Sequence, residues 1–126
     1  MSLTIYFTDP EITKRICVCS SCDNEHVHEF NETLFDRNIT HNLANMADAC
    51  GVYKCLWRPD ENDIKTASQL IEPLENALKM ILSDVGKFIK YNATNGWGTV
   101  EGFVMFLEDC LSAAKEYPLA LITVCR

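Results

Sequence analysis

The spacing of apolar residues changes along this chain from a period of two to a period near 3.6, and then back. Residues 3–8 alternate β-branched and aromatic side chains, which is typical of a strand. Asp9-Pro10-Glu11 predicts a turn and residues 12–18 a returning strand, so we expect a hairpin at the start of the fold. Residues 27–36 predict a further strand. Residues 119–124 are apolar on both faces, which predicts a central strand beside the first one.

Between these strands, three stretches place apolar residues on one helical stripe. We expect helices over residues 39–50, 70–82 and 100–114, with a short extra turn over residues 84–90. The sequence therefore predicts an α+β fold in a single domain, residues 1–126. Its small, mostly antiparallel sheet, made by the N-terminal hairpin and the C-terminal strand, would pack against about three helices.

Capping residues support the helix boundaries. Asn38 or Thr40 can cap the first helix, and Gly51 stands where a left-handed residue would end it. Pro73 predicts either a kink in the second helix or the first turn of its main part. Thr99 is the expected N-cap of the third helix.

The charge of the chain is acidic and unevenly distributed. Eleven Lys and Arg stand against eighteen Asp and Glu, a formal net charge of −7, which argues against a conventional nucleic-acid-binding protein. Residues 1–36 carry two basic and seven acidic side chains, so an acidic face there could meet a basic partner; a simply solvated surface is the alternative. No basic and apolar leader and no long apolar run is visible, so we expect a cytoplasmic protein without a membrane partner.

Seven cysteines, an odd number, favour a metal site or buried packing residues over a disulfide framework. Cys19 and Cys22 form a C-x-x-C pair, the spacing of a zinc knuckle. Further zinc ligands would come from a small set of nearby or spatially adjacent residues: Cys17, His26, His28 and His41. We expect either one structural Zn²⁺, a metal-free cysteine-rich turn, or a redox thiol pair. The other cysteines, Cys50, Cys55, Cys110 and Cys125, lie on apolar stripes or strands and predict packing residues.

A second group of candidate residues lies at the start of the first expected helix. Asn38, Thr40, His41 and Asn42 stand where backbone N–H groups and the helix dipole favour an anion, and His41 could donate a hydrogen bond or ligate a metal. The alternative is ordinary capping beside an exposed histidine.

Two tryptophans lie beside expected loops. Trp57 is followed by Arg58, a planar cation suited to stacking or to a carboxylate or phosphate, and Asn95-Gly96-Trp97 predicts a tight turn next to an indole. Each Trp could anchor a partner or cover the core. No catalytic motif is visible; an unrecognised hydrolase would depend on His41 with Glu101 or Arg58.

Four short motifs follow one another along the chain: NITHNL at residues 38–43, LWRP at 56–59, LIEPL at 70–74 and NGWG at 95–98. In this order they resemble a family of small, mostly uncharacterised proteins encoded by tailed bacteriophages and prophages. In that family the region corresponding to residues 17–28 varies and often carries a C-x-x-C knuckle. The resemblance implies a shared structural or binding role for the family-like positions Asn38, Thr40, His41, Asn42, Trp57, Arg58, Asn95, Gly96 and Trp97.

These observations together predict a non-enzymatic phage accessory protein. It would bind a host or defence protein, or a small ligand, in the cytoplasm of the infected cell, and would not bind nucleic acid directly. The alternatives are a zinc-stabilised structural or interaction module and, third, a hydrolase.

Overall fold

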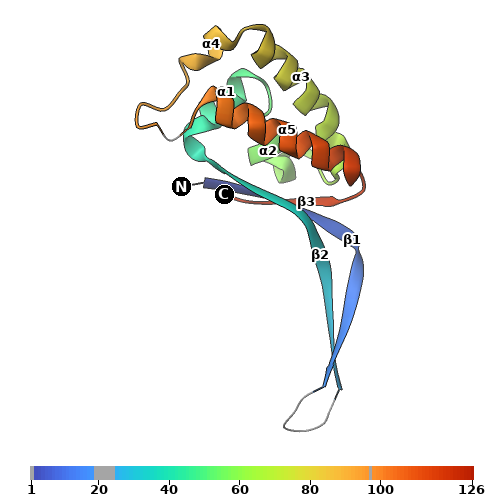
Figure 1. Cartoon of the computed structure of the whole chain (residues 1–126). Helices are drawn as coiled ribbons and strands as arrows, with labels where there is room; N and C mark the ends of the chain where they lie inside the picture. The colour runs from blue at the N-terminus through green and yellow to red at the C-terminus, as the bar shows by residue number, and fades with distance from the viewer. Residues whose placement is uncertain (1, 19–24, 97) are drawn as a thin grey trace.

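The computed structural model describes residues 2–18, 25–96 and 98–126, with the backbone alone for residues 13–18 and 25–28. It is an α+β fold, as the sequence predicts. Strands β1 (Ser2–Val18), β2 (Glu25–Thr40) and β3 (Leu121–Cys125) form an antiparallel three-stranded sheet in the order β2-β1-β3. The helices gather on one face of this sheet, and strands β1 and β2 extend well beyond the layer of helices (Figure 1).

The N-terminal hairpin differs from the prediction. Asp9-Pro10-Glu11 is not a turn, because β1 continues through it and pairs with β2 as far as Val18 opposite Glu25. Thr8 pairs with Thr33 and Ile12 with Asn31, so residues 9–11 bulge opposite a single residue of β2. Pro10 fits this bulge because it has no N–H to contribute to a ladder. The Asn31 side chain fastens the bulge by donating to the Asp9 carbonyl oxygen at 2.8 Å.

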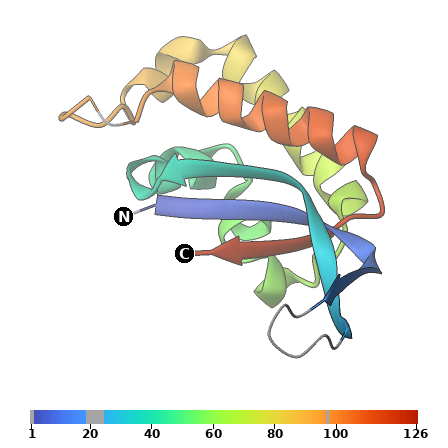
Figure 2. The ribbon, with the colours of Figure 1, turned by 60° about the horizontal axis from the view of Figure 1, so that its bottom comes forward.

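The C-terminal strand is also partly different from the prediction. β3 does pair with β1, from Thr4 opposite Cys125 to Thr8 opposite Leu121. However, β3 lies at the edge of the sheet, and β1 is the central strand (Figure 2). The strand begins at Leu121, later than predicted, because Leu119 lies in the preceding turn and is 73% exposed. Leu121, on the second face of β3, is 39% exposed, so the apolar residues there do not signify burial.

The second and third expected helices and the short extra turn lie where the 3.6-residue period predicts them, whereas the first expected helix is divided and begins later. The bounds are η1 (His41–Leu43), α1 (Ala44–Ala49), α2 (Tyr53–Trp57), η2 (Pro59–Asn62), η3 (Ala67–Leu70), α3 (Ile71–Ser83), α4 (Val85–Ile89) and α5 (Val100–Glu116). Pro73 lies in the first turn of α3, and Thr99 caps α5 by accepting from the Gly102 N–H at 3.1 Å. Gly51 follows α1 with a positive φ of 84°. The periodicity did not predict α2 and η2.

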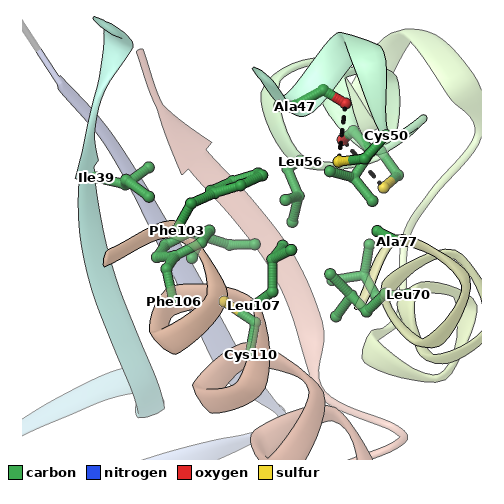
Figure 3. Close-up of a cluster of buried hydrophobic side chains, with 14 of the residues drawn as sticks. Ile39, Ala47, Cys50, Leu56, Leu70, Ala77, Phe103, Phe106, Leu107 and Cys110 are labelled. Atoms are coloured by element: carbon green, nitrogen blue, oxygen red, sulfur yellow. Dashed lines mark hydrogen bonds between the residues drawn. The ribbon is translucent and has the colours of Figure 1, made fainter. Parts of the chain in front are cut away.

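The core lies between the sheet and the helices. Leu3, Ile5 and Phe7 of β1 are fully buried on the face that meets α5, as alternation in a strand requires. Phe103, Phe106, Leu107 and Cys110 of α5 pack there with residues of α1, α2 and α3 (Figure 3). Among the described helices, none is long and apolar enough to cross a membrane.

Candidate functional site

The loop before α5 is ordered by its own hydrogen bonds. The Gly96 N–H donates to the Ala93 carbonyl at 3.1 Å, and the Ala93 N–H donates to the Gly98 carbonyl at 2.9 Å. The Asn92 side chain accepts from the Val100 N–H at 2.9 Å, so the loop is attached to the first turn of α5. The tight turn that Asn95-Gly96 predicts is present, with a φ of 79° at Gly96.

This loop lies directly against the start of the first helical segment. Gly98 has a φ of 130°, and a Cβ atom there would be 3.1 Å from Cγ of Leu43 and 3.2 Å from Cγ2 of Thr40. Only glycine fits both the backbone conformation and the contact. Two of the four sequence motifs, about fifty residues apart, are therefore held together by packing.

Where the two motifs meet, they form a polar hollow of about 400 Å³. Its polar lining residues are His41, Asn42, Asn45, Thr94 and Asn95. Among the described residues, no charged side chain lines it. The polar hollow therefore presents amide, hydroxyl and imidazole groups, which both donate and accept hydrogen bonds.

The remaining residues of these motifs lie in a neighbouring hollow of about 420 Å³, whose lining includes Asn38, Thr40, Gly96 and Gly98. Asn38 lies within β2 and does not cap a helix, because its amide donates to Ser2 Oγ at 2.9 Å and Thr4 Oγ1 at 2.8 Å across the sheet.

Thr40 does act as a cap, since its Oγ1 accepts from the Asn42 N–H at 3.2 Å. The segment it caps is shorter than the sequence predicts: η1 has three residues and α1 six, in place of one helix over residues 39–50. For Thr40 the structure therefore shows the ordinary capping that was the alternative to an anion site.

His41 is tied to the core through Trp57. The Trp57 Nε1–H donates to His41 Nδ1 at 2.9 Å, and the two rings are 6.4 Å apart. Because Nδ1 accepts this bond, the neutral ring carries its proton on Nε2 and can donate from there. The Nδ1 partner is an indole and not a carboxylate, so the arrangement lacks the orienting acid of a catalytic dyad.

Trp57 belongs to the core and not to the surface, because it is 2% exposed and stacks on Tyr53 with ring centroids 5.6 Å apart. It covers the core, which was the alternative to a surface anchor. A side-chain hydrogen bond with Tyr53 raises the pKa of the Arg58 guanidinium, and Arg58 Nε is 3.7 Å from a Glu61 carboxylate oxygen. Arg58 is not among the residues lining either hollow.

Most candidate zinc ligands lie outside the described residues. Cys19 and Cys22 are not described, nor are the side chains of Cys17, His26 and His28. The candidate binding residue Trp97 also lies outside the described residues. The backbone register still separates His41 from this group. Thr40, which precedes His41, pairs with Ser2, and His26 pairs with Cys17. Ser2 and Cys17 are fifteen residues apart along β1, which corresponds to about 50 Å of extended strand. A site that combines His41 with Cys17 or His28 does not fit this register.

Three of the four described cysteines are packing residues, as predicted. Burial raises the pKa of the Cys50 thiol to about 11 and that of Cys55 to about 12, and Cys110 is fully buried with a raised pKa. Their thiols stay protonated at neutral pH, which removes them as nucleophiles. Cys125 differs, because it is exposed.

No family model, curated protein or solved structure matches this chain. The site therefore rests on its own geometry, and the resemblance to phage proteins stays a prediction.

Asn45 and Thr94 were not among the predicted site residues. Asn45 follows His41 by four positions and Asn42 by three, so a helical-face argument could have included it. Thr94 lies between Asn92 and Asn95 in a loop whose pairing with residues 41–45 depends on tertiary packing. No local signal in the sequence indicates that pairing.

Proposed function

We propose that this chain is a non-enzymatic accessory protein that binds its partner in the polar hollow. The observation that carries the proposal is the meeting of His41, Asn42 and Asn45 with Thr94 and Asn95 in one uncharged concavity. The four-motif resemblance supplies the setting: a phage-encoded protein acting on a host or defence protein, or on a small ligand, in the host cytoplasm.

The lining of the polar hollow suggests the chemistry of its ligand. Carboxamide groups offer a donor and an acceptor side by side, and they suit neutral hydroxyl, amide or nucleobase groups. A ligand of this kind gains little from long-range charge, so its affinity should change little with salt. We infer a neutral, hydrogen-bonding group, carried by a small molecule or by an exposed loop of a host protein.

A panel of neutral polar compounds, comprising monosaccharides, nucleosides and short amides, tests this proposal by ligand-observed NMR. The test variant is Asn45→Ala with Asn95→Ala, and the matched control is Asn76→Ala, an exposed asparagine on α3. Compounds that bind the wild type and the control, but not the double variant, support the proposal. Binding that survives in the double variant, or a panel without any binder, contradicts it.

A second candidate function uses the acidic region over residues 9–36, whose described parts, residues 9–18 and 25–36 of β1 and β2, we call the arm. Its far part extends away from the helices (Figure 1), and its described carboxylates Glu11, Glu29, Glu32 and Asp36 are exposed. A basic partner would suit this surface, with an affinity that falls steeply with salt. Reversal of Glu29, Glu32 and Asp36 to lysine should abolish such binding. Unchanged partner binding in the triple variant would end this idea.

The zinc-stabilised module remains a third proposal, supported by the C-x-x-C spacing of Cys19 and Cys22. It predicts one zinc per chain in native mass spectrometry of protein purified without added metal. Chelation should then lower the melting temperature strongly, because metal-binding energy is folding energy in such sites. A metal-free, fully folded chain would exclude it.

A further inference from the structure

The outer edge of β3 is paired over only part of its length. Thr66 forms a bridge with Leu121, and the Ile122 N–H donates to the Lys65 carbonyl at 3.0 Å. The segment before η3 therefore begins to pair as a fourth strand, antiparallel to β3. In this register the positions after Lys65 and Ile122 would be Ile64 opposite Thr123 and Asp63 opposite Val124.

The fourth strand stops at that point because the chain turns away. Asp63 has a left-handed backbone conformation, with φ at 56° and ψ at 29°, and the preceding residues form η2. Antiparallel alternation points the Val124 N–H and C=O to the same side as the Ile122 N–H. Among the described residues no hydrogen bond reaches these Val124 groups, so the edge offers a donor and an acceptor in line with the interrupted strand.

A groove of about 580 Å³ lies along this edge, and we call it the edge groove. Pro59 and Ile64 line it on one side and Ile122 and Val124 on the other, so its lining is largely apolar. It is the largest of the hollows described above, and it is separate from the polar hollow, with which it shares no lining residue.

Two acidic and two basic side chains line the edge groove: Asp60, Asp63, Lys65 and Arg126. Arg126 is occupied, since its Nη1 donates to Asp60 Oδ1 at 3.0 Å and to the Trp57 carbonyl at 2.8 Å. The Asp63 carboxylate also lines the groove, and among the described residues no ion pair or hydrogen bond engages it. Asp63 therefore offers a partner for a cationic side chain of a ligand, and Lys65 offers one for an acidic side chain.

We propose that the edge groove binds an extended peptide segment of a partner protein, which adds a strand beside Val124. Main-chain hydrogen bonds to Val124 would continue the pairing that Lys65 and Thr66 begin. Alternate apolar side chains would enter the groove, and a lysine or arginine would meet Asp63. This surface is independent of the polar hollow and stands whether or not that hollow binds a ligand.

A random octapeptide library, selected against the full-length wild-type protein, tests the proposal. The expected result is enrichment of peptides that alternate apolar residues and carry one Lys or Arg. Val124→Pro removes an outward-facing N–H, which an edge strand tolerates, and it also replaces a half-buried side chain that lines the groove. It should weaken the selected peptides roughly threefold to tenfold, the effect of one lost backbone hydrogen bond. Leu119→Ala, exposed and outside the groove, is the matched control and should leave their affinity unchanged.

Two further measurements keep the test independent of how Val124→Pro folds. Two versions of the selected peptide would be N-methylated, one at the odd and one at the even positions. One version should lose binding to the wild-type protein, because its methyl groups block the N–H groups that face β3, and the other should keep it. Asp63→Asn keeps a residue that tolerates the left-handed conformation and should weaken binding at low salt but not at high salt.

Other outcomes overturn the proposal. Absence of enrichment would do so, as would peptides that bind equally well in both N-methylation patterns. A dimer of the wild-type protein that dissociates in Val124→Pro would assign the edge to a second copy of the chain in place of a peptide.

Discussion

The hydrogen bond between Trp57 and His41 connects the core to the polar hollow through a single pair of side chains. The indole is 2% exposed, and His41 Nδ1 is its hydrogen-bond acceptor. A buried donor without a partner carries the cost of its lost hydration. His41 therefore contributes to folding as well as to the lining of the hollow, and a loss of function on its replacement would have two possible causes.

Replacement of His41 by alanine should lower the free energy of unfolding by about 1–3 kcal/mol, because the Trp57 N–H loses its acceptor. Asn45→Ala is the matched control in the same hollow: its side chain is exposed, and we expect a change within about 0.5 kcal/mol. Urea denaturation followed by tryptophan fluorescence measures both. Equal stabilities of the two variants would contradict the structural role of His41.

Two glycines with positive φ allow the cost of backbone strain to be measured separately from the cost of close packing. Gly51 has a φ of 84° with nothing within 4 Å of an added Cβ, whereas Gly98 has a φ of 130° and a Cβ there would meet Leu43 and Thr40. Gly51→Ala should cost about 1–2 kcal/mol from backbone strain alone. Gly98→Ala should cost about 1 kcal/mol or more beyond that, because Leu43 must also move. Denaturation curves that show the reverse order would mean that the loop does not pack against η1 as described.

At the scale of elements, local period and caps were enough to predict α3, α4 and α5. Thr99 caps α5 and Pro73 opens α3, as their chemistry requires. The same local signals gave a wrong prediction of a turn at residues 9–11, because Asp-Pro-Glu suits a bulge as well as a turn. Whether the chain reverses there depends on what β2 pairs with, and no local pattern contains that information.

The strand order and the site were harder to predict for a related reason. Residues 119–124 are apolar on both faces, yet β3 lies at the edge, where its apolar residues line the edge groove or stay exposed. The sequence did single out His41, Asn42 and Asn95, but only tertiary contact shows that they share one hollow and that Trp57 lies below it in the core. Elements as short as α2 and η2 have too few turns to show a helical period.

The end of β3 is joined to η2 by an ion pair with a defined dependence on pH. The Arg126 guanidinium lowers the pKa of the Asp60 carboxyl below its ordinary value of 3.8. A carboxyl whose pKa is lower in the folded state stabilises the fold above the unfolded-state pKa, and this stabilisation is lost as pH falls through the folded-state pKa.

Asp60→Asn should therefore be less stable than the wild type at neutral pH, and the difference should close as pH falls below 3.8. In an Arg126→Gln background, Asp60→Asn should have no such pH-dependent effect, because the partner is already absent. Chemical denaturation between pH 2 and pH 7 checks both variants. A difference that widens in acid would contradict the assignment.

At the scale of the whole molecule, the polar hollow and the arm, like the edge groove, are surfaces of different chemistry at separate places in the fold. The polar hollow has no charged lining residue among those described and is held by packing between η1 and the loop before α5, while the arm carries exposed carboxylates and extends beyond the helical layer at its far part (Figure 1). Charge composition alone allows either a partner-binding acidic surface or a simply solvated one. The fold adds a neutral concavity whose lining residues come from segments about fifty residues apart, and this is the surface to which we assign binding.

The measurement that tests this assignment most directly is an amide chemical-shift titration of the isotope-labelled full-length chain with the tightest compound from the neutral panel, at low and at high salt. We predict shifts concentrated at residues 41–45 and 93–96, with a Kd that changes less than about twofold between the two conditions, because no charged side chain lines the polar hollow among the described residues. Shifts concentrated on residues 29–36, with an affinity that falls about tenfold at high salt, would contradict it and assign binding to the arm.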